Sequence, residues 1–190
     1  MNREERKAFF KTGLKTRAAD DGKKYIEGYF VVYNQETELW PGWFEQIAAG
    51  ALDDSLKNND IRCLFNHNSD NVMGRVSAGT LELKSDEYGL WGKVEINESD
   101  SMAMDVYARV SRGDITGCSF GFYAGHEDEE YYIENDIWHW KVLRADIYEI
   151  SICSFPAYQQ TEIQARKKQQ GQRLEMRRNA LKIKLEGIKC

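Results

Sequence analysis

Residues 116–122 read Thr-Gly-Cys-Ser-Phe-Gly-Phe, and the interpretation of the whole chain starts from them. Ser119 stands between two glycines, in a run that is otherwise apolar enough to form a buried strand. Small neighbours let another backbone come close to a hydroxyl and leave backbone N–H groups free to face it. The pattern therefore indicates a strand that carries a chemically useful serine.

A serine hydroxyl is a weak nucleophile and needs a base, which is most often a histidine. The chain has three histidines: His67, His126 and His139. His67 is the best placed, because it follows the apolar, strand-like residues 61–65 in the turn-like run Asn-His-Asn. The other two are more typical of surface and packing positions. We interpret Ser119 and His67 as a hydrolytic pair.

Glu149 is the best candidate for a third member. It lies in a strand-like run, residues 147–153, whose other members are nearly all apolar. Burying a carboxylate is costly unless it is paired, and an acid that orients a catalytic histidine would have such a pair. Asp146 is a weaker candidate, because it stands at the start of the strand, where solvent is close.

Cys118 is an alternative nucleophile beside Ser119. Successive strand residues face opposite ways, so only one of the two can meet the histidine. We prefer the serine, because thiols in apolar runs of intracellular proteins are usually structural. Cys63 and Cys153 also lie in apolar runs, and neither a CxxC pair nor a metal-ligand spacing of histidines is present. We therefore expect no metal and no cofactor.

The pattern of residues predicts many strands and two helices, without the alternation typical of parallel α/β folds. The predicted helices cover residues 44–56 and 99–113, and residues 81–84 and 90–96 resemble a hairpin. Residues 1–24 are polar and charged, which predicts either an irregular N-terminal segment or a first edge strand. These elements indicate an α+β fold built as a barrel or a sandwich. Further strands are expected at residues 25–34, 61–65, 72–76, 116–122, 131–133, 137–143 and 147–153.

Charge divides the chain into two parts. Residues 166–190 contain nine Lys and Arg and two acids, which gives them a charge of +7. The whole chain has a net charge of −5, so residues 1–165 carry −12. An acidic body is a poor general nucleic-acid binder, and the basic tail has no aromatic residues on which bases could stack. Leu174, Leu181, Leu185 and Ile188 have helical spacing. We expect one domain at 1–163, which contains the hydrolytic pair, and a basic helical tail at 164–190, which either binds a partner or is solvated.

Neither a membrane span nor a signal peptide is apparent in the sequence. No apolar run reaches the roughly 18 residues that a span needs. The first seven residues, Met-Asn-Arg-Glu-Glu-Arg-Lys, lack an apolar segment. These features favour a cytoplasmic protein without a membrane partner.

Six segments, in order, resemble the prohead (procapsid) maturation proteases of tailed phages, which are relatives of the herpesvirus assemblins. Together they cover about residues 25–160. Each segment alone is a weak match, but the six in the family's order are a specific one. Cys118 stands where the family often has an aliphatic residue. The matching segments are residues 26–34, 44–47 with 50–52, 64–68, 74–76, 117–122 and 148–157.

The resemblance implies an assemblin-like α+β fold: a mostly antiparallel, closed or nearly closed β-barrel flanked by a few helices. It also implies a serine endopeptidase with Ser119 as nucleophile, His67 as base and an acid at Glu149. Because assemblins use a second histidine as third member, His139 stays open for that role. The implied substrates are scaffold segments of the major capsid protein and the protease itself, inside the procapsid in the bacterial cytoplasm. Self-association into a homo-oligomer, and a catalytically silent assembly module of the same fold, stay open.

Overall fold

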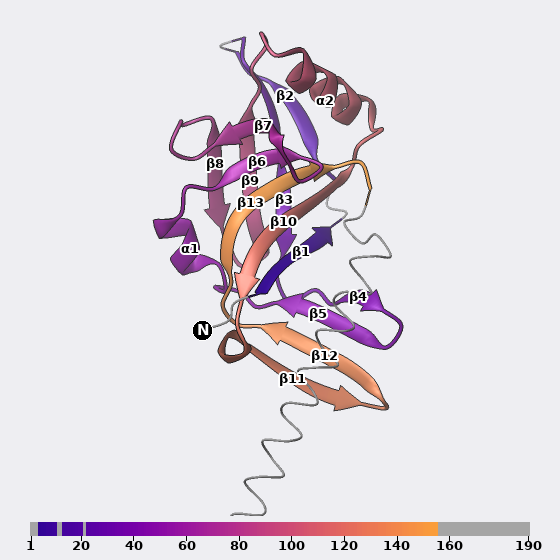
Figure 1. The fold of residues 1–190 in the computed structure, drawn as a ribbon. Helices are drawn as coiled ribbons and strands as arrows, with labels where there is room; N and C mark the ends of the chain where they lie inside the picture. The colour runs from indigo at the N-terminus through magenta and orange to yellow at the C-terminus, as the bar shows by residue number, and fades with distance from the viewer. Residues whose placement is uncertain (1–3, 11–12, 21, 156–190) are drawn as a thin grey trace, which may run out of the picture. The chain divides into compact units, whose positions relative to one another are not determined.

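The computed structural model describes residues 4–10, 13–20 and 22–155, and they form three hydrogen-bonded sheets with two α-helices (Figure 1). Every described element precedes Ser154. The predicted tail, residues 164–190, lies outside the described residues. No helix within the described part of the chain is both long and apolar enough to cross a membrane.

Sheet A, the five-stranded sheet, carries the serine segment. Its strand order is β1-β10-β13-β6-β7, and neighbouring strands are antiparallel except for the parallel pair β13 and β6. The strands are β1 (Glu4–Phe10), β10 (Gly117–Ala124), β13 (Asp146–Cys153), β6 (Arg62–Phe65) and β7 (Asn68–Arg75).

Sheet B packs against sheet A through an apolar core. Phe30 and Leu90 of sheet B are fully buried with Phe120 and Ile150 of sheet A in one cluster of side chains. Burying a side chain of this size stabilises the fold by about 1.5–3 kcal/mol. The strands, in order, are β2 (Lys15–Ala18), β3 (Lys24–Val32), β9 (Gly89–Glu95) and β8 (Leu81–Ser85).

Sheet C is a separate, aromatic-rich sheet, drawn at the lower end of Figure 1. Trp43 stacks on Trp138 at 4.9 Å between ring centroids, and Tyr131 stacks on Trp140 at 4.8 Å. The strands, in order, are β11 (Glu129–Glu134), β12 (Ile137–Val142), β5 (Trp43–Ile47) and β4 (Thr37–Trp40), and a 3-10 turn (His126–Asp128) precedes β11.

Two helices join the sheets. The longer helix, α2 (Ser101–Arg112), begins at Asp100, whose carboxylate accepts hydrogen bonds from the N–H groups of Met102 and Ala103. It ends at Gly113, which adopts φ +85°, a conformation that glycine adopts at little cost. The predictions of this helix and of the hairpin formed by β8 and β9 are confirmed.

The strand-rich prediction is confirmed, but the closed barrel is wrong. Among the described residues, sheet A ends at β1 and β7 and sheet B ends at β2 and β8, whereas a barrel requires its end strands to pair. Four further strands form the separate sheet C, in which β5 pairs in parallel with β12.

The predicted helix at residues 44–56 is also largely wrong. Residues 43–47 form strand β5, and only α1 (Asp53–Asn58) is helical. The buried side chains of β5 are Glu45 and Ile47, which is a period of two. Because one of these is a carboxylate, the strand period is invisible in a count of apolar residues.

Candidate active site

Ser119 lies on the central part of β10, directly opposite Ser151 of β13. Residues opposite each other in an antiparallel pair share a face of the sheet, with Cβ atoms about 4.5–5.5 Å apart. Glu149 lies two residues before Ser151 and therefore on the same face. All three are buried: both serines are 0% exposed and Glu149 is 3% exposed. The pairing of two strands thus places two hydroxyls and a carboxylate together.

Gly121 provides the space for this carboxylate. It lies opposite Glu149, and a Cβ atom on it would stand 2.6 Å from Glu149 Oε1 and 2.5 Å from the ring of Tyr148. Real Cβ atoms do not approach other atoms this closely. A side chain at Gly121 would therefore force the Glu149 carboxylate and the Tyr148 ring to shift from these positions.

His67 lies in the turn between β6 and β7, in a left-handed conformation (φ +57°) that follows another at Asn66 (φ +54°). The Asn66 N–H donates to the carbonyl of Ile152 (2.9 Å), and its side-chain oxygen accepts from the Ser154 N–H (2.9 Å). The His67 N–H donates to Ser151 Oγ at 3.2 Å. These bonds attach the turn to β13 and hold the uncommon backbone conformation.

The His67 ring contacts the buried acid. Its Nδ1 lies 2.7 Å from Glu149 Oε1, and Ser151 Oγ donates to Glu149 Oε2 at 2.6 Å. A carboxylate accepts, so Nδ1 donates to it, and in the neutral imidazole Nε2 is then the nitrogen that can accept a proton. That Nε2 is buried and has no hydrogen-bond partner among the described residues. An unprotonated Nε2 is what a general base for a serine hydroxyl requires.

The Ser119 hydroxyl does not bond to His67 in this structure. Ser119 Oγ donates to the backbone carbonyl of Ala8, on strand β1, at 2.6 Å. The structure therefore brings Ser119, His67 and Glu149 to one face of sheet A. His67 and Glu149 are in contact, whereas the hydroxyl of Ser119 is held by strand β1.

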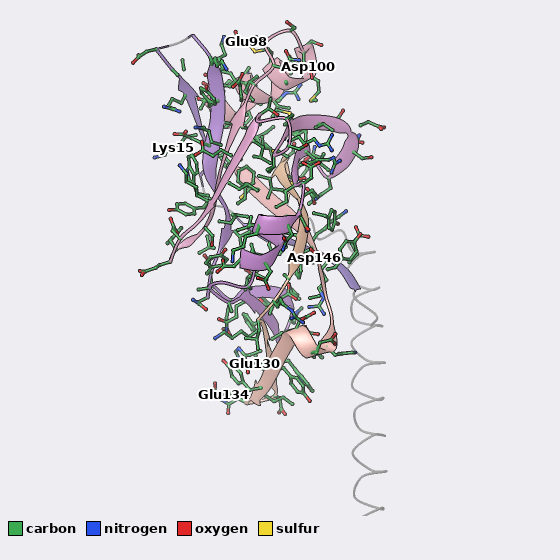
Figure 2. All side chains as sticks on the ribbon, turned by 90° about the vertical axis from the view of Figure 1, so that its left-hand side faces the viewer. Lys15, Glu98, Asp100, Glu130, Glu134 and Asp146 are labelled. Carbon is green, nitrogen blue, oxygen red and sulfur yellow. The ribbon has the colours of Figure 1, made fainter. Side chains whose placement is uncertain are left out.

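The alternative candidates lie elsewhere. Cys118 faces the core, where its thiol donates to the carbonyl of Tyr29 at 3.2 Å. His139 lies on β12 of sheet C, with its Nδ1 2.7 Å from Glu36 Oε1. Asp146, labelled in Figure 2, accepts a hydrogen bond from Asn59 Nδ2 at 2.6 Å. None of these contacts joins His67.

The remaining described cysteines, Cys63 and Cys153, are buried and form no disulfide. Burial raises the pKa of the Cys63 thiol well above its usual value, and the charge of Glu149 adds to this effect. Burial likewise raises the pKa of Cys153 to about 12. No group of three or more His, Cys, Asp or Glu side chains within the described ranges could hold a metal ion.

Two contributors were not singled out from the sequence. Ser151 contacts both Glu149 and the backbone of His67, and its position two residues after the acid in an apolar strand is a signal that could have identified it. Strand β1 contacts Ser119, and its charged residues gave no indication of this.

Three comparisons place the chain among known proteins. The model of a family described as caudovirus prohead serine protease matches residues 12–176. The prohead protease of Enterobacteria phage HK97 is 31% identical over 155 residues, which are 80% of this chain and 64% of that relative's length. The capsid assembly protease of bacteriophage T4 has a similar fold, with a TM-score of 0.52 at 10% identity, over 80% of this chain and 99% of that one.

Proposed function

Because the chain belongs to the family of caudovirus prohead serine proteases, we propose that it is a serine endopeptidase with Ser119 as nucleophile, His67 as base and Glu149 as orienting acid. The observation that carries the proposal is the 2.7 Å contact between His67 Nδ1 and Glu149, an acid on the same sheet face as Ser119; His67 Nε2 is buried and has no hydrogen-bond partner within the described part of the chain.

The chemistry follows the roles of these groups. Ser119 Oγ attacks a peptide carbonyl carbon while His67 Nε2 takes the hydroxyl proton. The same nitrogen then returns the proton to the amine that leaves. Glu149 keeps Nδ1 protonated and stabilises the imidazolium, and Ser151 holds Glu149 in place. Backbone N–H groups near Ser119 would stabilise the oxyanion. Water hydrolyses the acyl-enzyme by the reverse sequence of proton transfers.

The substrates that the family suggests are scaffold segments of the major capsid protein, together with the protease itself, inside the assembling procapsid of the bacterial host. The basic tail, residues 164–190, would dock the enzyme on coat or scaffold protein. Homo-oligomerisation is compatible with this role.

A mass measurement tests the activity. The purified chain is incubated with coat-protein precursor, beside the Ser119→Ala and Cys118→Ala variants. We expect fragments from the wild type and from Cys118→Ala, and none from Ser119→Ala. Cleavage by Ser119→Ala, together with loss of cleavage in Cys118→Ala, would assign the nucleophile to the cysteine.

A second candidate function is a catalytically silent assembly module. The observation that favours it is the complete burial of Ser119, whose hydroxyl is bonded to Ala8 rather than to the histidine. A module of this kind would bind coat protein and leave it uncleaved, whereas the protease would yield fragments in the same incubation.

A further inference from the structure

Strand β1 covers the edge of the serine strand. It pairs antiparallel with β10 along its whole length, from Glu4 opposite Ala124 to Phe10 opposite Cys118. The other edge of β10 is paired with β13, so β1 occupies the edge that another strand could use (Figure 1). Pairing of this kind uses backbone groups, and an extended polypeptide from any source can in principle replace an edge strand.

The position of β1 is that of a polypeptide presented to Ser119. The Ala8 carbonyl oxygen lies 2.6 Å from Ser119 Oγ. A peptide carbonyl beside the nucleophile is what an extended substrate must provide. The structure holds this carbonyl by a donated hydrogen bond, with no covalent bond between the two groups.

Arg6 fixes β1 two residues before this carbonyl. Its guanidinium donates two hydrogen bonds to the Glu129 carboxylate, at 2.8 and 3.0 Å, and lies 3.3 Å from Glu45 Oε2. The three side chains are almost completely buried, at 7%, 0% and 3% exposure for Arg6, Glu129 and Glu45. Both acids come from sheet C rather than sheet A. A strand paired with β10 thus makes a second specific contact, with sheet C, away from the serine.

The charges explain why this place selects a cation. Two buried carboxylates require a positive partner, because an uncompensated buried charge is strongly destabilising. The planar guanidinium matches a carboxylate with two parallel hydrogen bonds. An ion pair with a purely structural role does not require that its strand lie at a sheet edge. Nor does it require that the same strand place a carbonyl at the candidate nucleophile. Here one short strand supplies both contacts.

We propose that Glu45 and Glu129 form an acidic subsite for a basic side chain of an extended polypeptide bound along β10, and that Arg6 of the chain's own strand β1 fills this subsite and shields Ser119. The basic residue stands two positions before the residue whose carbonyl meets Ser119. Cleavage of the bound polypeptide rests on the proposed function, but its binding does not.

Binding of a peptide to the full chain tests the proposal. The probe is a fluorescein-labelled peptide with the sequence of residues 3–12, measured by fluorescence anisotropy. In the Arg6→Ala chain β1 loses its anchor, so the probe should bind on the order of tenfold or more tighter than to the wild type. The Lys84→Ala chain is the control: it loses the same charge from an exposed position on β8 of sheet B, away from the β10 edge, and should behave as the wild type does.

Changes in the peptide provide the reciprocal test. A probe with Arg6→Ala should bind the Arg6→Ala chain on the order of tenfold more weakly, and a probe with Lys7→Ala should still bind. Hydrogen exchange of the β10 amides should accelerate in the Arg6→Ala chain and slow again when the probe is added. Equal binding to the wild-type and Arg6→Ala chains, or equal effects of the two substitutions, would overturn the proposal.

Circular dichroism and thermal unfolding show whether the variants fold. If Arg6→Ala does not fold, the Arg6→Lys chain replaces it in the test. Lysine keeps the positive charge but cannot make the two parallel hydrogen bonds of the guanidinium, so the probe should still displace β1 and bind. If neither variant folds, Arg6 is a structural ion-pair partner and the proposal is wrong. Failure of the proposed function looks different: the probe would bind as expected, but no variant would cleave it.

Discussion

Glu149 is the residue on which the site geometry most depends, because it contacts His67 and Ser151 with its two oxygens and lies over Gly121. Ser151 gives this acid a hydrogen-bond donor that does not depend on the histidine. The backbone N–H of His67 bonds to the same hydroxyl. The site is therefore a small network in which the acid, the turn and the strand support one another.

Replacing this acid should separate chemistry from folding. Glu149→Gln keeps the size of the side chain but removes the charge that holds the histidine tautomer, so turnover should fall by about 10³–10⁴-fold. The thermal midpoint should change little by comparison. Asp146→Asn is the matched control, because it removes a carboxylate from the same strand and should retain most activity. Equal losses in both variants, measured as initial rates of cleavage, would contradict the assignment.

The buried thiols make a prediction about pH. Because burial raises the pKa of Cys63 and Cys153, the folded state favours their neutral form. Their contribution to stability is complete below the usual thiol pKa of about 8.5 and is lost as the pH rises toward about 12, the pKa of Cys153 in the fold.

At pH 8 both thiols should therefore resist alkylation by iodoacetamide in the native chain and react in urea, with the modified peptides mapped by mass spectrometry. The free energy of unfolding should also decrease between pH 8.5 and 10.5. Rapid native alkylation of either residue would show that the thiol is exposed or ionised.

At the scale of elements, local sequence signals predicted those segments whose conformation they control directly. Helix α2 was found because Asp100 and Gly113 act on the adjacent backbone. Strand β5 was missed because its conformation depends on pairing with β12, far along the chain. The edge strand that was one of two alternatives for residues 1–24 is present as β1, but its partner β10 was not predicted, because buried Arg6 is compensated by acids of another sheet. Tertiary pairing overrides such local patterns.

The cap of α2 gives a quantitative test at this scale. Figure 2 labels Asp100 at the start of the helix, where its carboxylate accepts bonds of 2.9 and 3.4 Å. Asp100→Ala should lower the free energy of unfolding by about 1 kcal/mol. Asp105→Ala removes an exposed pair with Arg109, which contributes about 0.2–0.5 kcal/mol, but gains the higher helix propensity of alanine, so the free energy of unfolding should change by less than about 0.5 kcal/mol. Urea unfolding followed by circular dichroism measures both, and equal effects would mean that the cap does not stabilise the helix.

At the scale of the whole molecule, the candidate residues chosen from the sequence lie together on one sheet face, whereas the arrangement of the sheets was not predicted. Ser119, His67 and Glu149 were chosen for their chemistry and neighbours, and they reach one sheet face. Division of the strands into three sheets depends on register and on which edges pair, for which short strands carry little local information. The occupation of the β10 edge by β1 is a consequence of the same long-range pairing.

The prediction for the tail, residues 166–190, concerns the assembled particle rather than the isolated chain. Deleting residues 166–190 removes the charge of +7 that we expect to dock on coat or scaffold protein. Cleavage of a small peptide should be nearly unchanged, whereas incorporation into procapsids, measured by gel analysis of purified particles, should fall. Unchanged incorporation would make the tail dispensable, and loss of folding would make it part of the domain.

The most direct test of the central claim is mapping of a fluorophosphonate adduct on the native full chain by mass spectrometry. The account predicts one adduct, on the peptide containing Ser119, that forms slowly in the wild type and faster in Arg6→Ala. It should be absent from His67→Ala and from the chain unfolded in urea, because the serine is reactive only beside its base. An adduct that forms equally in His67→Ala, or none on Ser119 in either the wild type or Arg6→Ala, would contradict the account.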